Sequence, residues 1–164
     1  MASLRKLLPI LIHKIDNLPE NVYIIQLLRT EFGDSCRMTF KASFLSVGNG
    51  DCTIVELPDG ATMVVDTFNA RSNANDARPD LENPMNHLSR LGVSSIYRYI
   101  QTHPDMDHMD GLADLSALSI ANFWDTKNTR ARPDQFEYGF REEDWDAYQT
   151  LRKSNAVKSY TRSA

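Results

Sequence analysis

The chain has 164 residues, of which 41% are hydrophobic and 24% charged, and its formal net charge is −4. This length and apolar content are enough for one domain with a buried core. The acidic balance argues against a broadly basic nucleic-acid-binding surface, although not against a local basic cleft. Cys36 and Cys52 come without a secretory signal, which predicts reduced thiols in a cytoplasmic protein. No apolar run approaches the roughly 20 residues of a membrane helix, so we expect no membrane contact.

The first 37 residues differ in pattern from the rest of the chain. Apolar side chains recur there at helical spacing, interrupted by Pro9, at Leu4, Leu7, Leu8, Leu11 and Ile15. His13 is isolated and is expected on the surface of this helix, not as a ligand. The segment Val22–Leu28 fits a helix or a strand equally well. We therefore expect residues 1–37 to be an N-terminal extension of unclear status and the recognisable domain to span residues 38–164, beginning at Met38.

From Phe40 the sequence has the alternation of β-strands. Apolar and polar residues alternate over Phe40–Phe44, and Cys52–Leu57 reads as a second strand. The Pro-Asp-Gly sequence at 58–60 is a strong hairpin signal, so Ala61–Thr67 is expected to return as a third strand. Gly50 allows the backbone to pass close to another group, so Asp51 either points toward a functional loop or caps the turn.

The next part of the chain is a long polar stretch followed by a helix and a strand. Residues 68–84 read as a loop, in which Arg71 and Arg78 either meet an anionic substrate or, as we favour, lie in solvent. A helix is expected over Pro84–Leu91. His87 lies beside its apolar face, where packing or solvent exposure is a better interpretation than ligation. A strand over Ile96–Thr102 then leads into the most informative segment of the chain.

That segment is THPDMDH at 102–108, which we call the metal loop, and it holds two histidines and two carboxylates. A strand before it and a helical pattern after it place these side chains on a tight turn, where they can converge. Imidazole and carboxylate are the usual ligands of Zn²⁺, Mn²⁺ and Fe²⁺. Four ligands are too many for one tetrahedral ion with an open position, which favours two ions. The expected pairs are His103 with Asp105 and Asp107 with His108; the alternative is a polar surface loop with chance histidines.

After the metal loop the pattern alternates between helix and strand. A helix is expected over about Asp110–Leu118 and a strand over Ile120–Trp124. A second helix is expected over Glu142–Arg152, with acidic residues in its first turn. The tail, 153–164, is basic and small and is expected to fray. Taken together, the elements predict an α/β fold.

Three motifs together resemble a known family. The HxDxDH segment at 103–108 resembles the HxHxDH signature of the metallo-β-lactamase fold, with Asp105 in place of the second histidine. The variant is similar to that of the C-terminal metallo-β-lactamase domain of the competence protein ComEC. The sequence VGNGD at 47–51 is similar to the VGQGD motif of that subfamily, and MVVDT at 63–67 to its strand ending in an aspartate. The resemblance covers about residues 40–125, with the motifs in the same order.

The resemblance implies a fold and a chemistry. The fold is the first half of an αββα sandwich, a mixed β-sheet with flanking helices. The chemistry is that of a hydrolase with two divalent metal ions, Mn²⁺ or Zn²⁺, and the implied ligands are His103, Asp105, Asp107 and His108. Asp107 would also position the attacking water as the catalytic residue. Asp66 would lie beneath the metal loop and orient it, with Asp51 as a second supporting candidate. The HxDxDH variant implies a phosphodiester or other phosphoester substrate, nucleic acid among them.

The resemblance also implies a missing half. The second half of the metallo-β-lactamase fold supplies further histidine and aspartate ligands, whereas no histidine follows His108 in this chain. We therefore expect the chain to be a truncated part of a longer hydrolase. The alternative is an inactive module that acts through protein association. In both cases the inner face of the half-sandwich would need cover from a partner chain or from a second copy in a homo-oligomer.

Overall fold

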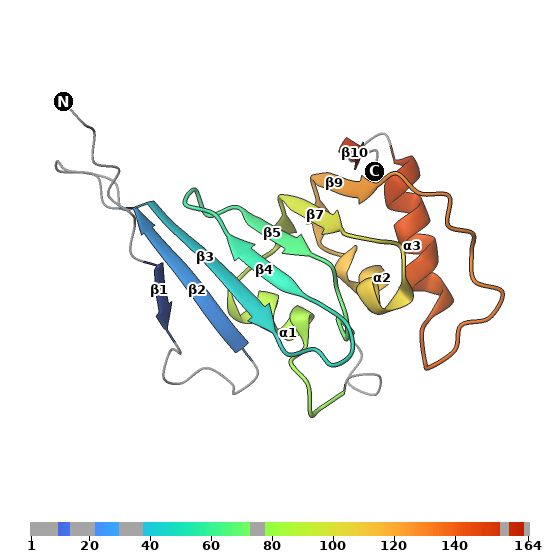
Figure 1. Ribbon diagram of the computed structural model, residues 1–164, viewed down its shortest axis with the longest axis horizontal. Helices are drawn as coiled ribbons and strands as arrows, with labels where there is room; N and C mark the ends of the chain where they lie inside the picture. The colour runs from blue at the N-terminus through green and yellow to red at the C-terminus, as the bar shows by residue number, and fades with distance from the viewer. Residues whose placement is uncertain (1–9, 14–21, 30–37, 73–77, 155–157, 163–164) are drawn as a thin grey trace.

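The computed structural model describes residues 10–13, 22–29, 38–72, 78–154 and 158–162. Its main element is an eight-stranded mixed β-sheet in the order β1-β2-β3-β4-β5-β7-β9-β10 (Figure 1). These strands are β1 (Ile10–His13), β2 (Val22–Arg29), β3 (Met38–Leu45), β4 (Thr53–Glu56), β5 (Thr62–Val65), β7 (Arg98–Gln101), β9 (Asn122–Thr126) and β10 (Lys158–Arg162). Two short strands, β6 (Ser95–Ile96) and β8 (Ser119–Ile120), pair separately. The helices are α1 (Pro84–Arg90), the 3₁₀ turn η1 (Met106–His108), α2 (Leu112–Leu115) and α3 (Glu142–Lys153).

The direction of strand pairing changes at β5. Strands β1 to β5 pair with their neighbours in antiparallel fashion, whereas β5, β7, β9 and β10 pair in parallel. Parallel neighbours need crossover connections, and these contain α1, α2 and α3. The carboxyl ends of β5, β7 and β9 therefore meet at one edge of the sheet, where α/β proteins gather functional side chains. Asp66, His103 and Asn128 follow these three strand ends.

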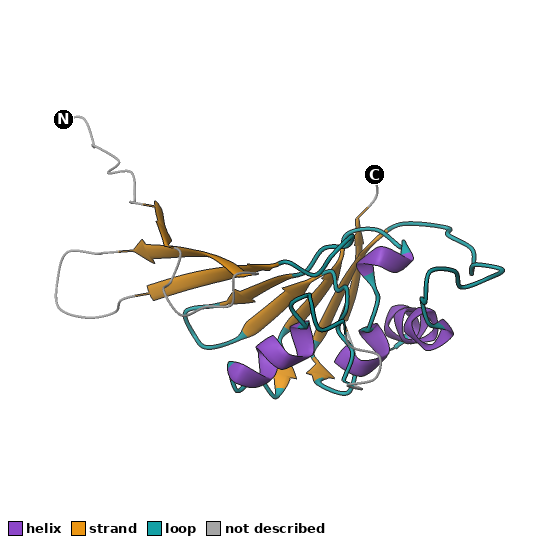
Figure 2. Cartoon of the chain, turned by 90° about the horizontal axis from the view of Figure 1, so that it is seen from below, coloured by secondary structure: helices purple, strands orange, loops and turns teal. Residues whose placement is uncertain are grey.

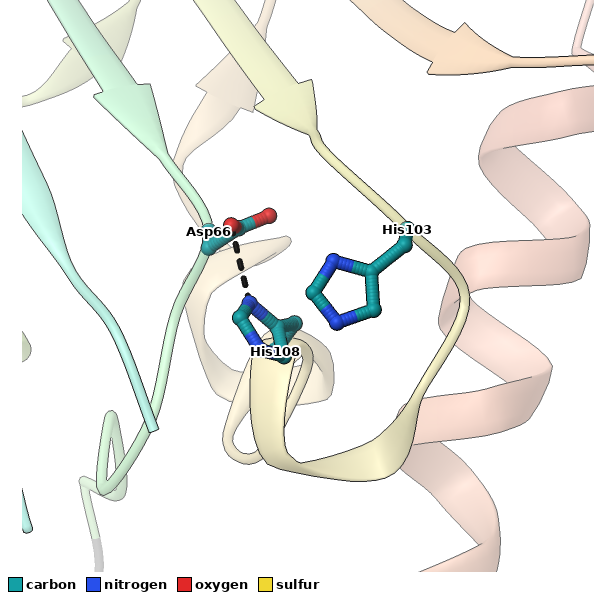
Figure 3. Close-up of side chains that lie close together, drawn as sticks. All are labelled: Asp66, His103 and His108. Atoms are coloured by element: carbon teal, nitrogen blue, oxygen red, sulfur yellow. Dashed lines mark hydrogen bonds and ion pairs between the residues drawn. The ribbon is translucent and has the colours of Figure 1, made fainter. Parts of the chain in front are cut away.

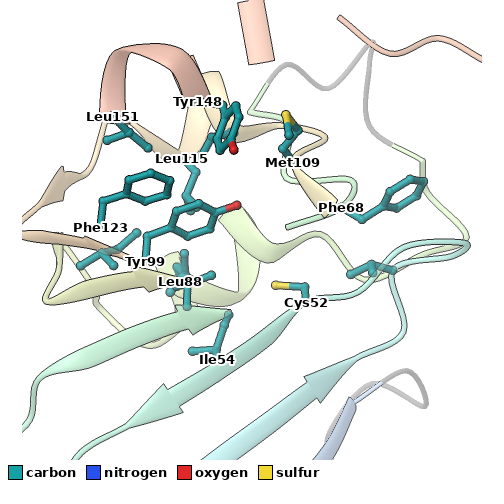
Figure 4. Packing of buried hydrophobic residues seen from close by; sticks show 14 of the residues in the cluster. Cys52, Ile54, Phe68, Leu88, Tyr99, Met109, Leu115, Phe123, Tyr148 and Leu151 are labelled. Atoms are coloured by element: carbon teal, nitrogen blue, oxygen red, sulfur yellow. The ribbon is translucent and has the colours of Figure 1, made fainter. Parts of the chain in front are cut away.

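The core lies between the sheet and the helices. Ile54, Val64, Tyr99 and Phe123 occupy neighbouring register positions across four strands, and all four are fully buried. Figure 2 shows α1, α2 and α3 on one side of the sheet. All three helices contribute buried side chains to the cluster that includes this row (Figure 4), among them Leu88, Leu115 and Tyr148. The rings of Tyr99 and Phe123 stack with their centroids 5.9 Å apart, so the packing is specific as well as apolar.

The opposite face of the sheet carries a second apolar row. Phe44, Val65, Ile100 and Trp124 lie on it at neighbouring register positions, with Thr53 of β4 between the first two. Val65, Ile100 and Trp124 are half-buried, and Phe44 is 42% exposed. None of the helices α1, α2 and α3 lies on this face (Figure 2). The row is thus partly shielded by its own neighbours but is not covered by a helical layer.

Most elements predicted between residues 40 and 152 are confirmed. They include the hairpin at 58–60, the strands β3, β4, β5, β7 and β9, and the helices α1 and α3. The helix predicted over 110–118 is confirmed only as the single turn α2. Gly111 has a φ of 89°, in the left-handed region, so the α-helix begins only at Leu112. The described part of the chain contains no helix long and apolar enough to cross a membrane.

Both ends of the chain differ from the sequence-based expectations. Ile10–His13 is a strand, so the helix predicted there is wrong and His13 lies on a strand. Pairing with β2 outweighs a helical spacing that Pro9 already interrupts. The remaining helical positions, Leu4, Leu7, Leu8 and Ile15, fall outside the described residues. At the other end, Lys158–Arg162 pairs with β9 as a strand and does not fray. The proposed boundary at Met38 stays a prediction.

The start and the end of the predicted polar loop 68–84 are packed against the domain. Arg71 is 7% exposed and forms an ion pair with the fully buried Asp110, so the favoured interpretation, that this arginine lies in solvent, is wrong, and a substrate contact stays a prediction. Asn83 caps α1, because its side-chain oxygen accepts hydrogen bonds from two backbone N–H groups of the first turn. His87 is buried, which confirms packing and rules out solvent exposure, the two interpretations that the sequence left open.

Glu82 anchors the beginning of α1 through charged contacts. Its carboxylate pairs with Arg90, and it lies 3.5 Å from His87 Nδ1. Burial alone would raise the pKa of Glu82, but the hydrogen bonds from His87 and Arg90 outweigh it and hold the pKa below its usual 4.5. The ionised carboxylate is therefore part of what stabilises this corner of the fold.

Candidate metal centre

The metal loop begins where β7 ends and closes on the turn η1. Gln101, the last residue of β7, is 1% exposed. Its Nε2 donates hydrogen bonds to the backbone oxygens of His103 and His108, at 2.8 and 2.9 Å. The backbone N–H of His108 donates to the backbone oxygen of Asp105 at 3.0 Å. One buried glutamine therefore holds both histidine-bearing ends of the loop in place.

Asp66 lies beneath the loop at the end of β5. It has a φ of 52°, a left-handed conformation that aspartate adopts more readily than most residues. Its Oδ1 accepts a hydrogen bond from the backbone N–H of Thr102 at 2.8 Å, and its Oδ2 accepts one from the Thr102 hydroxyl at 2.5 Å. Its Oδ2 also lies 2.9 Å from Nδ1 of His108 (Figure 3). This single carboxylate, 3% exposed, orients both the start and the end of the loop.

The hydrogen bonds assign the protons of both histidines. The Thr102 hydroxyl gives its one hydrogen to Asp66, so its oxygen accepts from Nδ1 of His103, 3.0 Å away. Nδ1 of His108 donates to the Asp66 carboxylate. Both rings therefore use Nδ1 as a donor within the fold, which leaves Nε2 as the nitrogen that can bind a metal. The two rings lie side by side, with centroids 3.7 Å apart (Figure 3).

Each Nε2 faces one of the two carboxylates of the loop. Nε2 of His103 lies 3.8 Å from Oδ2 of Asp105, and Nε2 of His108 lies 3.9 Å from Oδ2 of Asp107. The side chains of Asp105 and Asp107 are 45% and 43% exposed, whereas that of His108 is 11% exposed. The four predicted ligands thus form two histidine–aspartate pairs with an open side toward solvent.

A second grouping of possible ligand atoms overlaps this set. Asp66, His103 and His108 each offer one ligand atom, and these atoms lie within 4.8 Å of one another (Figure 3). Both oxygens of Asp66 already accept hydrogen bonds from the loop. Its carboxylate behind a histidine is the arrangement that supports metal ligands in many sites.

Glycines allow neighbouring segments to approach the loop closely. A Cβ at Gly50 would lie 2.0 Å from the backbone oxygen of Asp107, so only glycine fits where the β3–β4 turn meets the loop. The close approach expected at Gly50 is therefore present. Asp51 itself is exposed, and within the described residues its carboxylate makes no hydrogen bond or ion pair with the loop. Its supporting role stays a prediction.

The surroundings are fixed by buried charges that sequence reasoning did not find. Asp125, at the carboxyl end of β9, accepts a hydrogen bond from the Tyr148 hydroxyl at 2.9 Å and pairs with Arg152 at 3.0 Å. Burial raises the pKa of Asp125 even though these donors oppose the shift, and burial is also the main reason that the pKa of Tyr148 rises to about 12. Asp144 on α3 is fully buried and pairs with Arg141 at 3.0 Å. These contacts tie α3 to β9. The backbone N–H of Ala113 also donates a hydrogen bond to Asp144, which ties α3 to the first turn of α2.

Three residues of the site carried no functional signal in the sequence. Thr102 and Gln101 act through hydrogen bonds that only the folded loop creates. Arg130, from the segment after β9, lies 3.2 Å from the Asp105 carboxylate, although the two residues are far apart in the sequence. Alternation or spacing cannot reveal such a contact, because it depends on how two strand ends are placed side by side.

Comparison with known proteins adds no relative. The chain matches no family model, no curated protein and no solved structure. The α/β architecture with a mixed sheet follows from the structure itself. What can be inferred about function therefore comes from the residues of the site.

Proposed function

We propose that this chain carries the metal-binding loop of a metal-dependent hydrolase whose substrate is a phosphodiester. The observation that carries the proposal is the state of the two histidines. Both rings use Nδ1 within the fold, and both direct Nε2 to a partly exposed carboxylate of the same loop. A polar surface loop with chance histidines has no reason to fix two imidazoles in this way.

The donor set suits two divalent ions. Two atoms bound to one ion at about 2.1 Å lie at most about 4.2 Å apart. The separations of 3.8 Å between His103 Nε2 and Asp105 Oδ2, and of 3.9 Å between His108 Nε2 and Asp107 Oδ2, fall inside that limit. Each pair would hold one ion, and Asp66 would hold His108 in place from behind. Bound ions of this kind activate water and neutralise charge developing on the substrate.

The residues of the chain have distinct tasks in this proposal. Asp107 is the proposed catalytic residue, because it is partly exposed at the open side and its second oxygen can hold the attacking water by a hydrogen bond. Asp66 and Gln101 keep the ligands in their positions. In the resembled metallo-β-lactamase fold a second half supplies further ligands, so metal binding is the part of the proposal that rests on the residues of this chain alone.

Asp105 sets the preferred metal in this proposal. A carboxylate in place of an imidazole makes the site richer in oxygen, which suits Mn²⁺ better than an imidazole-rich site does, whereas imidazole suits Zn²⁺. Zn²⁺ is still expected to bind tightly, so the preference is one of activity more than of affinity. We propose that Mn²⁺ supports the highest rate.

The test compares phosphodiesterase rates, with bis(4-nitrophenyl) phosphate as substrate, for the purified protein with Mn²⁺ and with Zn²⁺. Asp105→His is expected to move the preference toward Zn²⁺, and Asp107→Ala to abolish activity with either ion. Asp59→Asn is the matched control, since Asp59 is an exposed aspartate of the distant hairpin. Equal rates with the two ions in both wild type and Asp105→His would show that Asp105 is not a ligand.

A second candidate function is association without catalysis. The apolar row of Phe44, Val65, Ile100 and Trp124 on the helix-free face favours association, because apolar surface of this kind commonly marks an interface. Replacing Val65 by lysine would weaken self-association or partner binding, measured by analytical ultracentrifugation, and leave metal binding unchanged. A chain that is monomeric before and after the change, and that still binds metal, speaks against this candidate as a homo-oligomer.

A further inference from the structure

The segment after β9 brings a basic group to the metal loop. Arg130 Nη2 lies 3.2 Å from Oδ1 of Asp105, and the arginine side chain is 59% exposed. Pro104 and Asp105 on one side and residues 128–134 on the other line an open cleft of about 720 Å³. The guanidinium therefore lies at the mouth of the proposed metal site, in a space large enough for a small ester.

The segment is fixed at its base, so the position of Arg130 is built into the fold. Asn128 Nδ2 donates hydrogen bonds to the backbone oxygen of Thr126 and to the Tyr148 hydroxyl, both at 2.9 Å. Asn128 Oδ1 accepts from the backbone N–H of Arg130 at 3.2 Å. Arg152 on α3 donates to the backbone oxygen of Asn128, also at 3.2 Å.

We infer that Arg130 binds the anionic phosphate of the substrate and that, without metal, it serves as the counter-ion of Asp105. The planar guanidinium matches two oxygens of a phosphate, and such charge-assisted pairs are strong and directional. An exposed ion pair contributes little, so the contact with Asp105 is easily exchanged. Once Asp105 binds a cation, its charge is neutralised and Arg130 is released to an anion in the cleft.

The inference rests on the proposed function, since it takes Asp105 as a metal ligand, and it adds the basis of substrate choice. A positive group beside the metal loop favours an anionic diester over a neutral ester or lactam of similar size. Metal binding and phosphate binding are then coupled through the ion pair between Arg130 and Asp105. A metal bound to Asp105 frees Arg130 for phosphate, and a phosphate bound to Arg130 frees Asp105 for metal.

Arg132 provides the matched control on the same segment. Its guanidinium pairs with Glu142, and its Cζ lies 5.3 Å from the ring centroid of Phe136. It lines the same cleft and is 46% exposed. Arg132→Gln therefore removes the same charge from the same segment, but from a group directed to α3 and not to Asp105.

The first experiment uses chain freed of metal by a chelating resin. Binding of dimethyl phosphate is measured by ligand-observed NMR, with trimethyl phosphate as the neutral probe of similar shape. Asp105→Asn releases Arg130 and is expected to strengthen dimethyl phosphate binding several-fold. Adding Arg130→Gln to that variant is expected to weaken dimethyl phosphate binding by about tenfold or more, because a charge-assisted contact is lost. Adding Arg132→Gln instead is expected to change the binding by less than about twofold. Trimethyl phosphate should not distinguish the variants.

The second experiment measures Mn²⁺ affinity by isothermal titration in the absence of phosphate. Arg130→Gln removes a cation that competes for Asp105, so Mn²⁺ is expected to bind about two- to fivefold more tightly. One substitution thus weakens anion binding and strengthens metal binding. A merely structural role for Arg130 would weaken both.

The two experiments separate failure of the inference from failure of the proposed function. Unchanged dimethyl phosphate binding in the Arg130→Gln variants, or an equal loss with Arg132→Gln, overturns the role of Arg130 whatever the metal does. Absence of Mn²⁺ binding in every variant, combined with the expected anion result, overturns the proposed metal site and the metal coupling but keeps Arg130 as an anion-binding residue.

Discussion

Removal of the Asp66 carboxylate tests how the metal loop is held. Asp66→Ala deletes the acceptor of three hydrogen bonds, from the Thr102 N–H, the Thr102 hydroxyl and His108. Hydrogen bonds to a charged group contribute about 1.5–3 kcal/mol each, although exposed Thr102 regains part of its share from water. His108 is 8% exposed, so its Nδ1–H loses its partner without full replacement. Alanine at a φ of 52° adds about 1 kcal/mol of backbone strain. The expected loss of unfolding free energy is about 3–4 kcal/mol.

The assay is urea denaturation of metal-free protein, with Asp66→Asn as the matched variant. Asparagine tolerates the left-handed conformation, and its amide oxygen still accepts from the Thr102 N–H, so the expected loss is about 1–2 kcal/mol. Both variants should bind Mn²⁺ about 10- to 100-fold more weakly, because His108 is no longer held by a carboxylate. An Asp66→Ala protein within about 0.5 kcal/mol of wild type, with unchanged Mn²⁺ affinity, would refute this account of the loop.

Three further predictions concern the rest of the domain. Gly50→Ala places a Cβ 2.0 Å from the backbone oxygen of Asp107, so it should lower the unfolding free energy by about 2–3 kcal/mol and weaken metal binding. Gly60→Ala is the control: with a φ of 85° and nothing within 4 Å, it should lower the unfolding free energy by about 1 kcal/mol and leave metal binding intact. Because the pKa of Glu82 is lowered in the folded protein, its stabilising effect is present above pH 4.5 and is lost as the pH falls through the folded pKa. The difference in unfolding free energy between wild type and Glu82→Gln, measured in urea, should therefore shrink from pH 6 to about pH 3. A constant difference would contradict the stabilising role of the ionised carboxylate. Phe123→Ala should cost about 3–5 kcal/mol by thermal denaturation, since the ring is fully buried, and a loss below about 1 kcal/mol would contradict its place in the core.

The central elements of the fold could be predicted because their local patterns agree with their packing. Alternation over Phe40–Phe44 and the Pro-Asp-Gly turn at 58–60 are local signals, and the structure has a strand and a hairpin turn at these positions. The ends of the chain were different. Ile10–His13 and Lys158–Arg162 become strands by pairing with β2 and β9, which no local pattern specifies. Tertiary pairing outweighed a weak propensity in both places.

The candidate site divides in the same way. The metal loop could be found in the sequence because its four potential ligands lie within six consecutive residues. The hydrogen bonds from Gln101 and the ion pair from Arg130 could not be found in this way. The first join the end of β7 to the metal loop, and the second joins the segment after β9 to the same loop. Arg71 shows the opposite error: a charged residue in a polar stretch suggested solvent, but a buried partner, Asp110, lies 39 positions away. Sequence reasoning found the loop and the aspartate beneath it, Asp66, but missed the contacts from Gln101 and Arg130.

The most direct test of the account is the metal content of the purified chain. Elemental analysis after equilibration with Mn²⁺ should give two ions per chain, and chelation should lower the thermal stability. His103→Ala combined with His108→Ala should remove both ions, whereas Asp59→Asn should retain them. Less than one ion per chain, with no change in stability on chelation, would contradict the assignment of the metal loop and with it the proposed hydrolase.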